Sequence, residues 1–149
     1  MSQEWLLEGK PYNPDYEDIP EEYVGFVYRI TDTETGDQYI GQKRFRKTKT
    51  LPVTKTRKRR VKTLVESDWR AYYSSSSVIK ENVSQGLSDR YRREILRFGY
   101  SKGDLNYLEM LEQIKCNVLF DPKYLNGIIN VRIHQKHLSE KLKEELQHG

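Results

Sequence analysis

The feature that most constrains this chain is the segment FVYRITDTETGDQYIGQK, residues 26–43. Its beginning, FVYRIT, is rich in β-branched and aromatic residues, which favour a strand. The stretch DTETGD contains turn-forming glycine and aspartate, and QYIGQ has the composition of a second strand. The segment therefore predicts a β-hairpin that carries two tyrosines, Tyr28 and Tyr39, one on each strand.

Directly after this hairpin the chain becomes strongly basic. Residues 43–62 contain eleven lysines and arginines and no acidic residue. Like charges at this density repel one another, and nucleic acid neutralises them while releasing its condensed counterions. We therefore expect residues 43–64 to be a basic loop that binds DNA, with an acidic protein surface or a solvated loop as the alternatives. The residues expected to contact DNA are Lys43, Arg44, Arg46, Arg57, Lys58, Arg59, Arg60 and Lys62.

The composition indicates a small, highly charged domain. Of the 149 residues, 36% are hydrophobic and 32% are charged, which allows a modest core and excludes a wholly disordered chain. No run of about 18 apolar residues is present, so we expect no membrane span. The N terminus lacks the pattern of a secretory signal, and the single cysteine, Cys116, excludes an internal disulfide and a cysteine-type metal site. These features favour a cytoplasmic protein, and they leave the oligomeric state open, a monomer included.

The remaining segments predict an element order of β-β-α-β-α-β. Short helices are expected in SDWRAYY and in SSSSVIKENVSQG, where a serine would cap the start and Gly86 the end. A third strand is expected over residues 91–98, a helix over residues 103–115, and a final short strand in IINVRI. This order is typical of an α/β (α+β) domain with a mainly antiparallel sheet.

Three regions follow from these elements. Residues 1–22, in which prolines alternate with acidic residues, predict an irregular acidic leader. Residues 23–138 form the expected domain, with the basic loop of residues 43–64 as an insertion. Residues 139–149 are expected to be a polar C-terminal helix.

Five segments in this order resemble a known family. Val27-Tyr28 and Tyr39-Ile40-Gly41 resemble the paired half-motifs of the GIY-YIG endonucleases, with Phe26 where the family usually has glycine. DWRAYYSSSSVI, REILRFGYSKGDLNYLE and YLNGIINVRI resemble the phage-encoded Seg-type subgroup of that family. The resemblance covers residues 24–138 and implies a small, mainly antiparallel three-stranded sheet flanked by helices.

The resemblance also implies an activity. Members of the family are divalent-metal-dependent DNA endonucleases, so we expect phosphodiester hydrolysis by nicking or double-strand cleavage, in a phage-encoded, homing-endonuclease-like enzyme. Such hydrolysis needs a base for the attacking water, a Lewis acid and positive charge. We therefore expect one Mg²⁺ or Mn²⁺ ion as cofactor, DNA as partner, and the cytoplasm of a bacterial host cell as location. The alternative is a non-enzymatic nucleic-acid-binding module with the same fold.

By this resemblance Tyr28 is the general base, and Tyr39 orients it or the water. A free phenol is a poor base because its pKa is about 10. A cation and a metal-bound water beside the phenol would favour the phenolate, and Lys43 and Arg44 follow the hairpin closely enough to act there. The alternative is that both phenols simply pack on a face of the sheet.

The resemblance places the metal ligand on the helix after the third strand. Glu109 and Glu112 lie one turn apart on the helix face that also carries Leu105 and Leu108. A carboxylate that borders this apolar stripe is costly unless a metal or another partner neutralises it. Glu109, in Asn-Tyr-Leu-Glu, matches the Seg-type pattern better, and we expect it to bind the metal. The alternative for either residue is a solvated acid paired with a lysine.

Asn126, in Tyr-Leu-Asn, matches the asparagine that closes the family's site, where its amide would hold the catalytic hairpin. An asparagine before glycine is otherwise a common turn residue. His134 and His137 lack a third metal ligand at matching spacing, so we interpret them as surface residues. The serines of residues 74–77 have no recognisable triad partner, and we interpret them as a helix cap.

One residue of the family pattern has no counterpart. The main arginine of the family usually opens the first helix, but Asp68 precedes the Trp-Arg-Ala segment here. Another cation must then stabilise the transition state. The candidates are Lys43, which we prefer, then Arg70, and Arg44. Tyr72 or Tyr73 would take the place of a family histidine or tyrosine that faces the phosphate.

Overall fold

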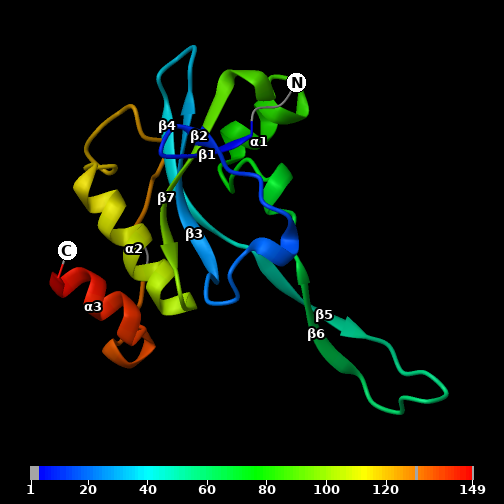
Figure 1. The fold of residues 1–149 in the computed structure, drawn as a ribbon. Coiled ribbons are helices and arrows are strands. Elements are labelled where there is room, and N and C mark those ends of the chain that lie inside the picture. Colours follow the sequence, from blue (N-terminus) through cyan, green and yellow to red (C-terminus); the bar gives the residue numbers. More distant parts are fainter. Residues whose placement is uncertain (1–3, 130, 149) are drawn as a thin grey trace.

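The protein is built around a five-stranded sheet with the strand order β2-β1-β7-β3-β4 (Figure 1). The computed structural model describes residues 4–129 and 131–148. All neighbouring strands are antiparallel except β1 and β7, which are parallel. The predicted α/β class with a mainly antiparallel sheet is confirmed, although the sheet is larger than the predicted three strands. Its strands are Trp5–Leu7 (β1), Lys10–Pro11 (β2), Gly25–Asp32 (β3), Gln38–Arg44 (β4) and Tyr91–Gly99 (β7).

The predicted tyrosine hairpin is formed by β3 and β4, and β4 is an edge strand of the sheet. In its register Tyr28 lies opposite Gly41, and Ile30 lies opposite Tyr39. Because side chains alternate between the faces of a strand, Tyr28 and its second neighbours share one face, and Val27 faces the other side. The hairpin therefore contributes to both layers of the core.

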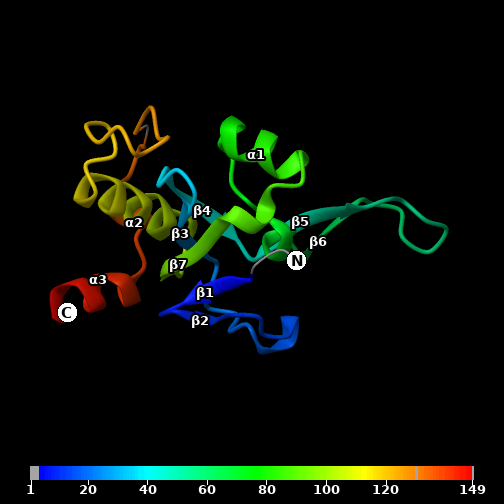
Figure 2. The same cartoon turned by 90° about the horizontal axis from the view of Figure 1, so that it is seen from above.

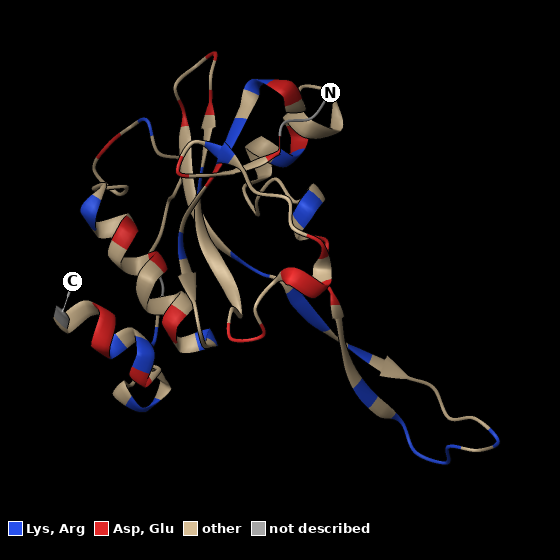
Figure 3. Cartoon of the chain, viewed as in Figure 1, with Lys and Arg blue, Asp and Glu red and all other residues tan. Residues whose placement is uncertain are grey.

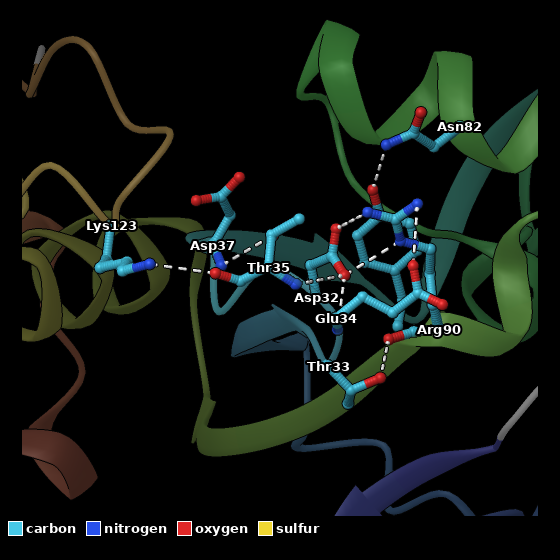
Figure 4. A network of polar contacts seen from close by, with 9 residues as sticks. Asp32, Thr33, Glu34, Thr35, Asp37, Asn82, Arg90 and Lys123 are labelled. Carbon is cyan, nitrogen blue, oxygen red and sulfur yellow. Dashed lines mark hydrogen bonds and ion pairs between the residues drawn. The ribbon is translucent and has the colours of Figure 1, made fainter.

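A polar network fixes the turn of this hairpin (Figure 4). The buried carboxylate of Asp32 accepts hydrogen bonds from the backbone amides of Glu34 and Thr35, at 2.9 and 3.3 Å. The Arg90 guanidinium donates to the same carboxylate through Nε, at 3.0 Å, and through a second nitrogen, at 2.5 Å. Burial alone would raise the pKa of Asp32, but these hydrogen bonds hold it below its ordinary value. The turn is thereby tied to the segment that enters β7.

Two hydrophobic clusters cover the two faces of the sheet, and helices lie on both sides of it (Figure 2). On one face, Val27 and Ile40 pack against helices α2 (Lys102–Lys115) and α3 (Glu140–His148). On the other face, the aromatic side chains of the sheet pack against the N-terminal segment, the short 3-10 helix η2 (Trp69–Ala71) and helix α1 (Ser77–Ser84). This second cluster includes Trp5, Phe26, Tyr28, Phe45, Trp69 and Tyr91.

The N-terminal segment is not the predicted irregular leader. Trp5 is buried, and its Nε1 donates a hydrogen bond to the backbone carbonyl of Trp69 at 2.7 Å. β1 pairs with β7, and a 3-10 helix, Tyr16–Asp18 (η1), follows β2. A three-residue strand is too short to produce a periodic signal, and it forms here because Trp5 enters the aromatic cluster.

The basic run also differs from the prediction, because most of it is a second β-hairpin and not a loop. β5 (Arg46–Leu51) and β6 (Val61–Glu66) pair antiparallel and project away from the sheet (Figure 1). Lysine and threonine alternate in RKTKTL, a period of two that is typical of a strand. The charge of the run obscured this pattern; its tip, residues 52–60, and the single residue Phe45 lack strand structure.

The predicted helices are confirmed as α1, α2 and α3, and SDWRAYY contains η2. Gly86 ends the α1 segment with a positive φ of 84°. Ser76 precedes α1 at the capping position, although its side chain makes no capping hydrogen bond. The predicted strand in IINVRI is wrong for the described residues 128–129 and 131–133, which are irregular. No helix within the described ranges is long and apolar enough to cross a membrane.

Candidate active site

A cavity of about 330 Å³ lies at the edge of the sheet, beside β4. Its walls come from β4, from α2 and from the chain that follows Leu125. The cavity thus joins the tyrosine hairpin to the helix expected to carry the metal ligand. Its lining includes Tyr39, Gln42, Asn106, Glu109, Asn126 and Arg132.

Glu109 is the carboxylate of this cavity. The Gln42 side-chain amide donates to its Oε2 at 2.6 Å, and the Gln113 amide donates to its Oε1 at 3.3 Å. Burial raises the pKa of Glu109, and the two amide donors offset this only in part. Glu112 does not line the cavity and lies 3.6 Å from the Lys115 ammonium. Of the two candidate glutamates, the structure therefore brings Glu109 into the site.

The donor set of the cavity fits a hard divalent cation. The described residues contain no group of three or more histidine, cysteine, aspartate or glutamate side chains that could hold a metal. Mg²⁺, however, is commonly held by one or two carboxylates, with water and substrate phosphate filling its other positions. Glu109 and the nearby Asn106 amide oxygen, which accepts from Gln42 at 2.8 Å, supply such oxygen ligands. A single ion with this mixed coordination is what the residues can hold.

Tyr28 lies within the aromatic cluster beside this cavity and is fully buried. Its ring packs against those of Tyr39 and Tyr72, with centroid distances of 6.4 and 6.0 Å. Its hydroxyl has no hydrogen-bond partner among the described residues. Burial, then the neighbouring phenols and the Glu109 carboxylate, raise the pKa of Tyr28 well above its ordinary value. This direction is the opposite of the one expected from nearby cations.

Lys43 does not supply that cation in this structure. Its ammonium lies 2.6 Å from the Asp68 carboxylate and 4.2 Å from the centre of the Tyr72 ring. The ion pair lowers the pKa of Asp68. Lys43 is therefore held at the edge of the aromatic cluster, where it contacts Tyr72, a ring that also packs against Tyr28. Tyr73 packs instead against the Arg93 guanidinium, so Tyr72 is the tyrosine of this pair that belongs to the site.

Two of the side chains expected to act as cations in the site or on DNA form hydrogen bonds with the N-terminal segment instead. The Arg70 guanidinium donates to Glu66 at 2.7 Å and to the Asn13 side chain at 2.6 Å. Arg46, an expected DNA contact, donates to the backbone carbonyl of Ile19 at 3.0 Å. The structure does not bring Arg70 to the Glu109 cavity, and it gives Arg46 a role in holding the N-terminal segment.

Tyr39 and Asn126 fix the edge of the hairpin. The Tyr39 hydroxyl shares a hydrogen bond of 2.9 Å with the Ser75 hydroxyl. The Asn126 amide donates to the Ile40 carbonyl at 2.8 Å, and its oxygen accepts from the Ile40 amide at 3.0 Å. The Asn126 side chain thus bonds to the backbone of β4 as a neighbouring strand would. The expected hydrogen bonding between the Asn126 amide and the hairpin is therefore present.

Four polar residues of the cavity were not predicted, among them Asn106, which lies three residues before Glu109 on α2. Gln42 directly follows the Tyr-Ile-Gly segment, and Gln113 lies four residues after Glu109, so both are recognisable once Glu109 is assigned. Arg132 lies in the segment that was predicted to be a strand, and its position was therefore not apparent. It is an arginine of the same cavity as Glu109.

The other predicted DNA contacts lie along the projecting hairpin and at its base (Figure 3). Arg57 at the tip is half-buried and donates to the Pro52 carbonyl at 2.7 Å. The side chains that remain exposed are Arg44, Lys58, Arg59, Arg60 and Lys62.

An edge hairpin with paired tyrosines, next to a helix that carries a half-buried carboxylate, defines the candidate site of this small α/β domain. Residues 5–129 match the model of the family described as "Putative endonuclease segE, GIY-YIG domain", and the chain belongs to this GIY-YIG endonuclease family. The match begins at the first residue of β1, so the family domain includes the N-terminal strands. Searches among curated proteins and among solved structures found no match.

Proposed function

We propose that this protein is a DNA endonuclease that hydrolyses phosphodiester bonds with one Mg²⁺ or Mn²⁺ ion held at Glu109. The observation that carries the proposal is the half-buried Glu109 carboxylate, whose hydrogen-bond donors among the described residues are the neutral amides of Gln42 and Gln113, in a cavity beside the tyrosine hairpin. Membership of the GIY-YIG family supports an endonuclease activity. By the same likeness we propose a phage-encoded, homing-endonuclease-like enzyme that acts in the cytoplasm of a bacterial host cell.

The bound metal would supply a Lewis acid for the phosphate. Gln42 and Gln113 would hold the Glu109 carboxylate in one orientation, because each donates to a different oxygen. Arg132 lines the same cavity and would add the positive charge that the missing family arginine supplies elsewhere.

Tyr28 is the proposed general base, and its raised pKa sets a condition on that role. The phenol must lose its proton to accept one from water, and burial opposes this in the free protein. A divalent cation held at Glu109 would add positive charge near the phenol and would favour the phenolate. Tyr39, which is held by Ser75, would orient the water or the Tyr28 hydroxyl.

A plasmid assay tests this proposal. Purified protein should nick or linearise supercoiled plasmid in Mg²⁺, and a chelator should stop the reaction. Glu109→Gln should not cleave. Its matched control is Glu112→Gln, because Glu112 lies outside the cavity, and this control should cleave like the wild type. Cleavage that survives the chelator would contradict the metal-dependent mechanism.

The second candidate is a nucleic-acid-binding module that does not cleave. It is favoured by the Lys43–Asp68 ion pair, which leaves the expected catalytic lysine neutralised by an acid at the place of the family arginine. Retardation of DNA in a gel without any cleavage in Mg²⁺ or Mn²⁺ would support this module over the endonuclease.

A further inference from the structure

A second cavity, of about 430 Å³, adjoins the Glu109 cavity, and Gln42 lines both. Its walls are the end of β4, the start of β5 and the residues before η2. Four basic side chains and one acidic side chain line it, so its charge is strongly positive. These side chains are Lys43, Arg44, Arg46, Lys47 and Asp68.

Asp68 is the anion that this basic cavity already contains. Its carboxylate pairs with the Lys43 ammonium at 2.6 Å, and its side chain is 71% exposed, against 19% for Lys43. The carboxylate can therefore swing into solvent, whereas Lys43 stays stacked on the Tyr72 ring at 4.2 Å. A phosphate oxygen offers the lysine the same charge and the same hydrogen-bond acceptor as this carboxylate.

The position of the cavity suggests which phosphate it would meet. Gln42 connects it to Glu109 on one side, because the Gln42 amide donates to the Glu109 carboxylate. Lys47 and Thr48 connect it to the β5–β6 hairpin on the other side. The cavity thus borders both the residue that contacts the candidate catalytic carboxylate and the first residues of the projecting basic hairpin.

We propose that this basic cavity binds the DNA phosphate next to the one that is cleaved. In the free protein Asp68 forms an ion pair with Lys43, and that phosphate takes the place of Asp68 when DNA binds. The proposal rests on the proposed endonuclease function and deepens it by assigning a second phosphate site. Arg44 and Lys47 complete the site, whereas Arg46 remains bound to the N-terminal segment. Lys43 is then a binding residue, in place of the catalytic role expected of it.

A double-mutant cycle tests this exchange. DNA affinity is measured by fluorescence anisotropy with a labelled duplex in EDTA, so that no cleavage occurs, for the wild type, Asp68→Asn, Lys43→Ala and the double variant. Asp68→Asn frees Lys43 and should tighten binding about threefold to fivefold at low salt, the scale of an exposed ion pair. Lys43→Ala should weaken binding and lower the salt slope by about 0.9. The gain from Asp68→Asn should disappear in the Lys43→Ala background.

Glu34→Gln is the matched control. Glu34 is an acid of similar exposure, 70%, which is paired with Arg90 at the far end of the β3–β4 hairpin. Its neutralisation changes the net charge by the same amount and should leave DNA affinity unchanged. Thermal unfolding of every variant checks that the fold is kept.

Two results would overturn the proposal. In the first, Asp68→Asn binds DNA no more tightly than Glu34→Gln does. In the second, its gain persists without Lys43, which would reveal a general effect of charge on DNA affinity. The endonuclease function is judged separately, by plasmid cleavage with the wild type in Mg²⁺. A protein that shows the predicted coupling but does not cleave contradicts only the endonuclease function, and one that cleaves without the coupling contradicts only the second phosphate site.

Discussion

Gly41 lies directly against the phenol of Tyr28, the residue opposite it in the hairpin. A Cβ atom at position 41 would stand 2.6 Å from Cζ of Tyr28 and 3.1 Å from the Tyr39 ring. The distance to Tyr28 is shorter than real Cβ contacts and the one to Tyr39 is tighter than most, so no other residue fits without moving the buried Tyr28. The glycine of the Tyr-Ile-Gly segment is therefore required by the packing of the two phenols and not by a turn.

Gly41→Ala should displace Tyr28 and destabilise the protein. Overpacking of this kind typically costs about 1–3 kcal/mol of unfolding free energy, and cleavage should fall because both tyrosines shift. Urea unfolding and single-turnover cleavage measure the two effects. Gly127→Ala is the control, because Gly127 lines the Glu109 cavity and a Cβ there would meet no atom within 4 Å. Equal stability of both variants with the wild type would contradict the packing argument.

Glu109→Gln should abolish cleavage while DNA affinity in EDTA stays nearly unchanged, because it removes a metal ligand and no phosphate contact. Calorimetric titration with Mg²⁺ should lose the binding heat of the wild type. Since burial raises the pKa of Glu109, protons should compete with the metal at higher pH than for an ordinary glutamate, and metal affinity should fall as the pH falls through that pKa. If Glu112→Gln loses metal binding instead, the metal ligand is Glu112, one helical turn from Glu109.

The same raised pKa predicts a stability effect that is independent of activity. A glutamate whose folded-state pKa lies above its unfolded value binds protons more tightly in the native state, so its ionisation destabilises the fold as the pH rises. Glu109→Gln should therefore be at least as stable as the wild type at neutral pH in the absence of metal. A marked loss of stability would show that the carboxylate is needed for folding.

Tyr28→Phe should lower the single-turnover rate about 100-fold or more, the usual scale for loss of a general base. Because the Tyr28 hydroxyl is buried without a partner among the described residues, its removal should not destabilise the fold. The pKa of Tyr28 is raised well above its ordinary value, so the wild-type rate should keep rising with pH without a plateau near neutrality. This rise should be absent in Tyr28→Phe. A near-normal rate in Tyr28→Phe together with an inactive Tyr39→Phe would reverse the two roles.

Asp32→Asn should loosen the turn that holds the tyrosine hairpin. Hydrogen bonds to charged groups contribute about 1.5–3 kcal/mol each, and this variant loses the ionic bond to Arg90. Because the folded-state pKa of Asp32 is lowered, its stabilisation is present above the unfolded pKa and is lost as the pH falls through the folded pKa. The stability difference from the wild type should thus shrink in acid. Asp37→Asn, in the same turn, is the control for charge alone.

The sequence predicted those parts of the site that depend on local pattern. The tyrosine hairpin, α2 and the side of α2 that carries Glu109 follow from turn residues and helical spacing. Asn126 was recognisable from its neighbours, although its bidentate pairing with Ile40 depends on the fold.

The parts that were missed depend on contacts distant in sequence. β1 has only three residues and is a strand because Trp5 packs into the aromatic cluster. Lys43 and Asp68 are separated by the whole basic hairpin, so their ion pair could not be deduced from spacing. Arg132 lines the cavity together with residues of β4 and α2, from which it is far in sequence.

The tip of the β5–β6 hairpin should provide DNA affinity without sequence preference, because contacts to phosphates carry little sequence information. Replacing Arg57, Lys58, Arg59 and Arg60 with alanine should weaken binding equally for unrelated duplexes. The salt slope should fall by up to about 0.9 for each lost phosphate contact, or roughly three to four if all four engage. Anisotropy titrations at several salt concentrations measure both quantities.

Cleavage at saturating DNA should survive this quadruple substitution, since the tip of the projecting hairpin lies far from α2 (Figure 1), the helix that carries Glu109. The control removes four lysines on or near α2 and α3, away from the projecting hairpin, and should keep the wild-type salt slope because it lowers the net charge by the same amount without touching the hairpin. These are Lys115, Lys136, Lys141 and Lys143. An unchanged slope in the tip variant would mean that the hairpin does not contact DNA. A collapse of its saturated cleavage rate with unchanged DNA affinity would instead mean that the tip folds over the active site. In that case the tip would contact the reacting phosphate and contribute to the cleavage rate without contributing to DNA affinity.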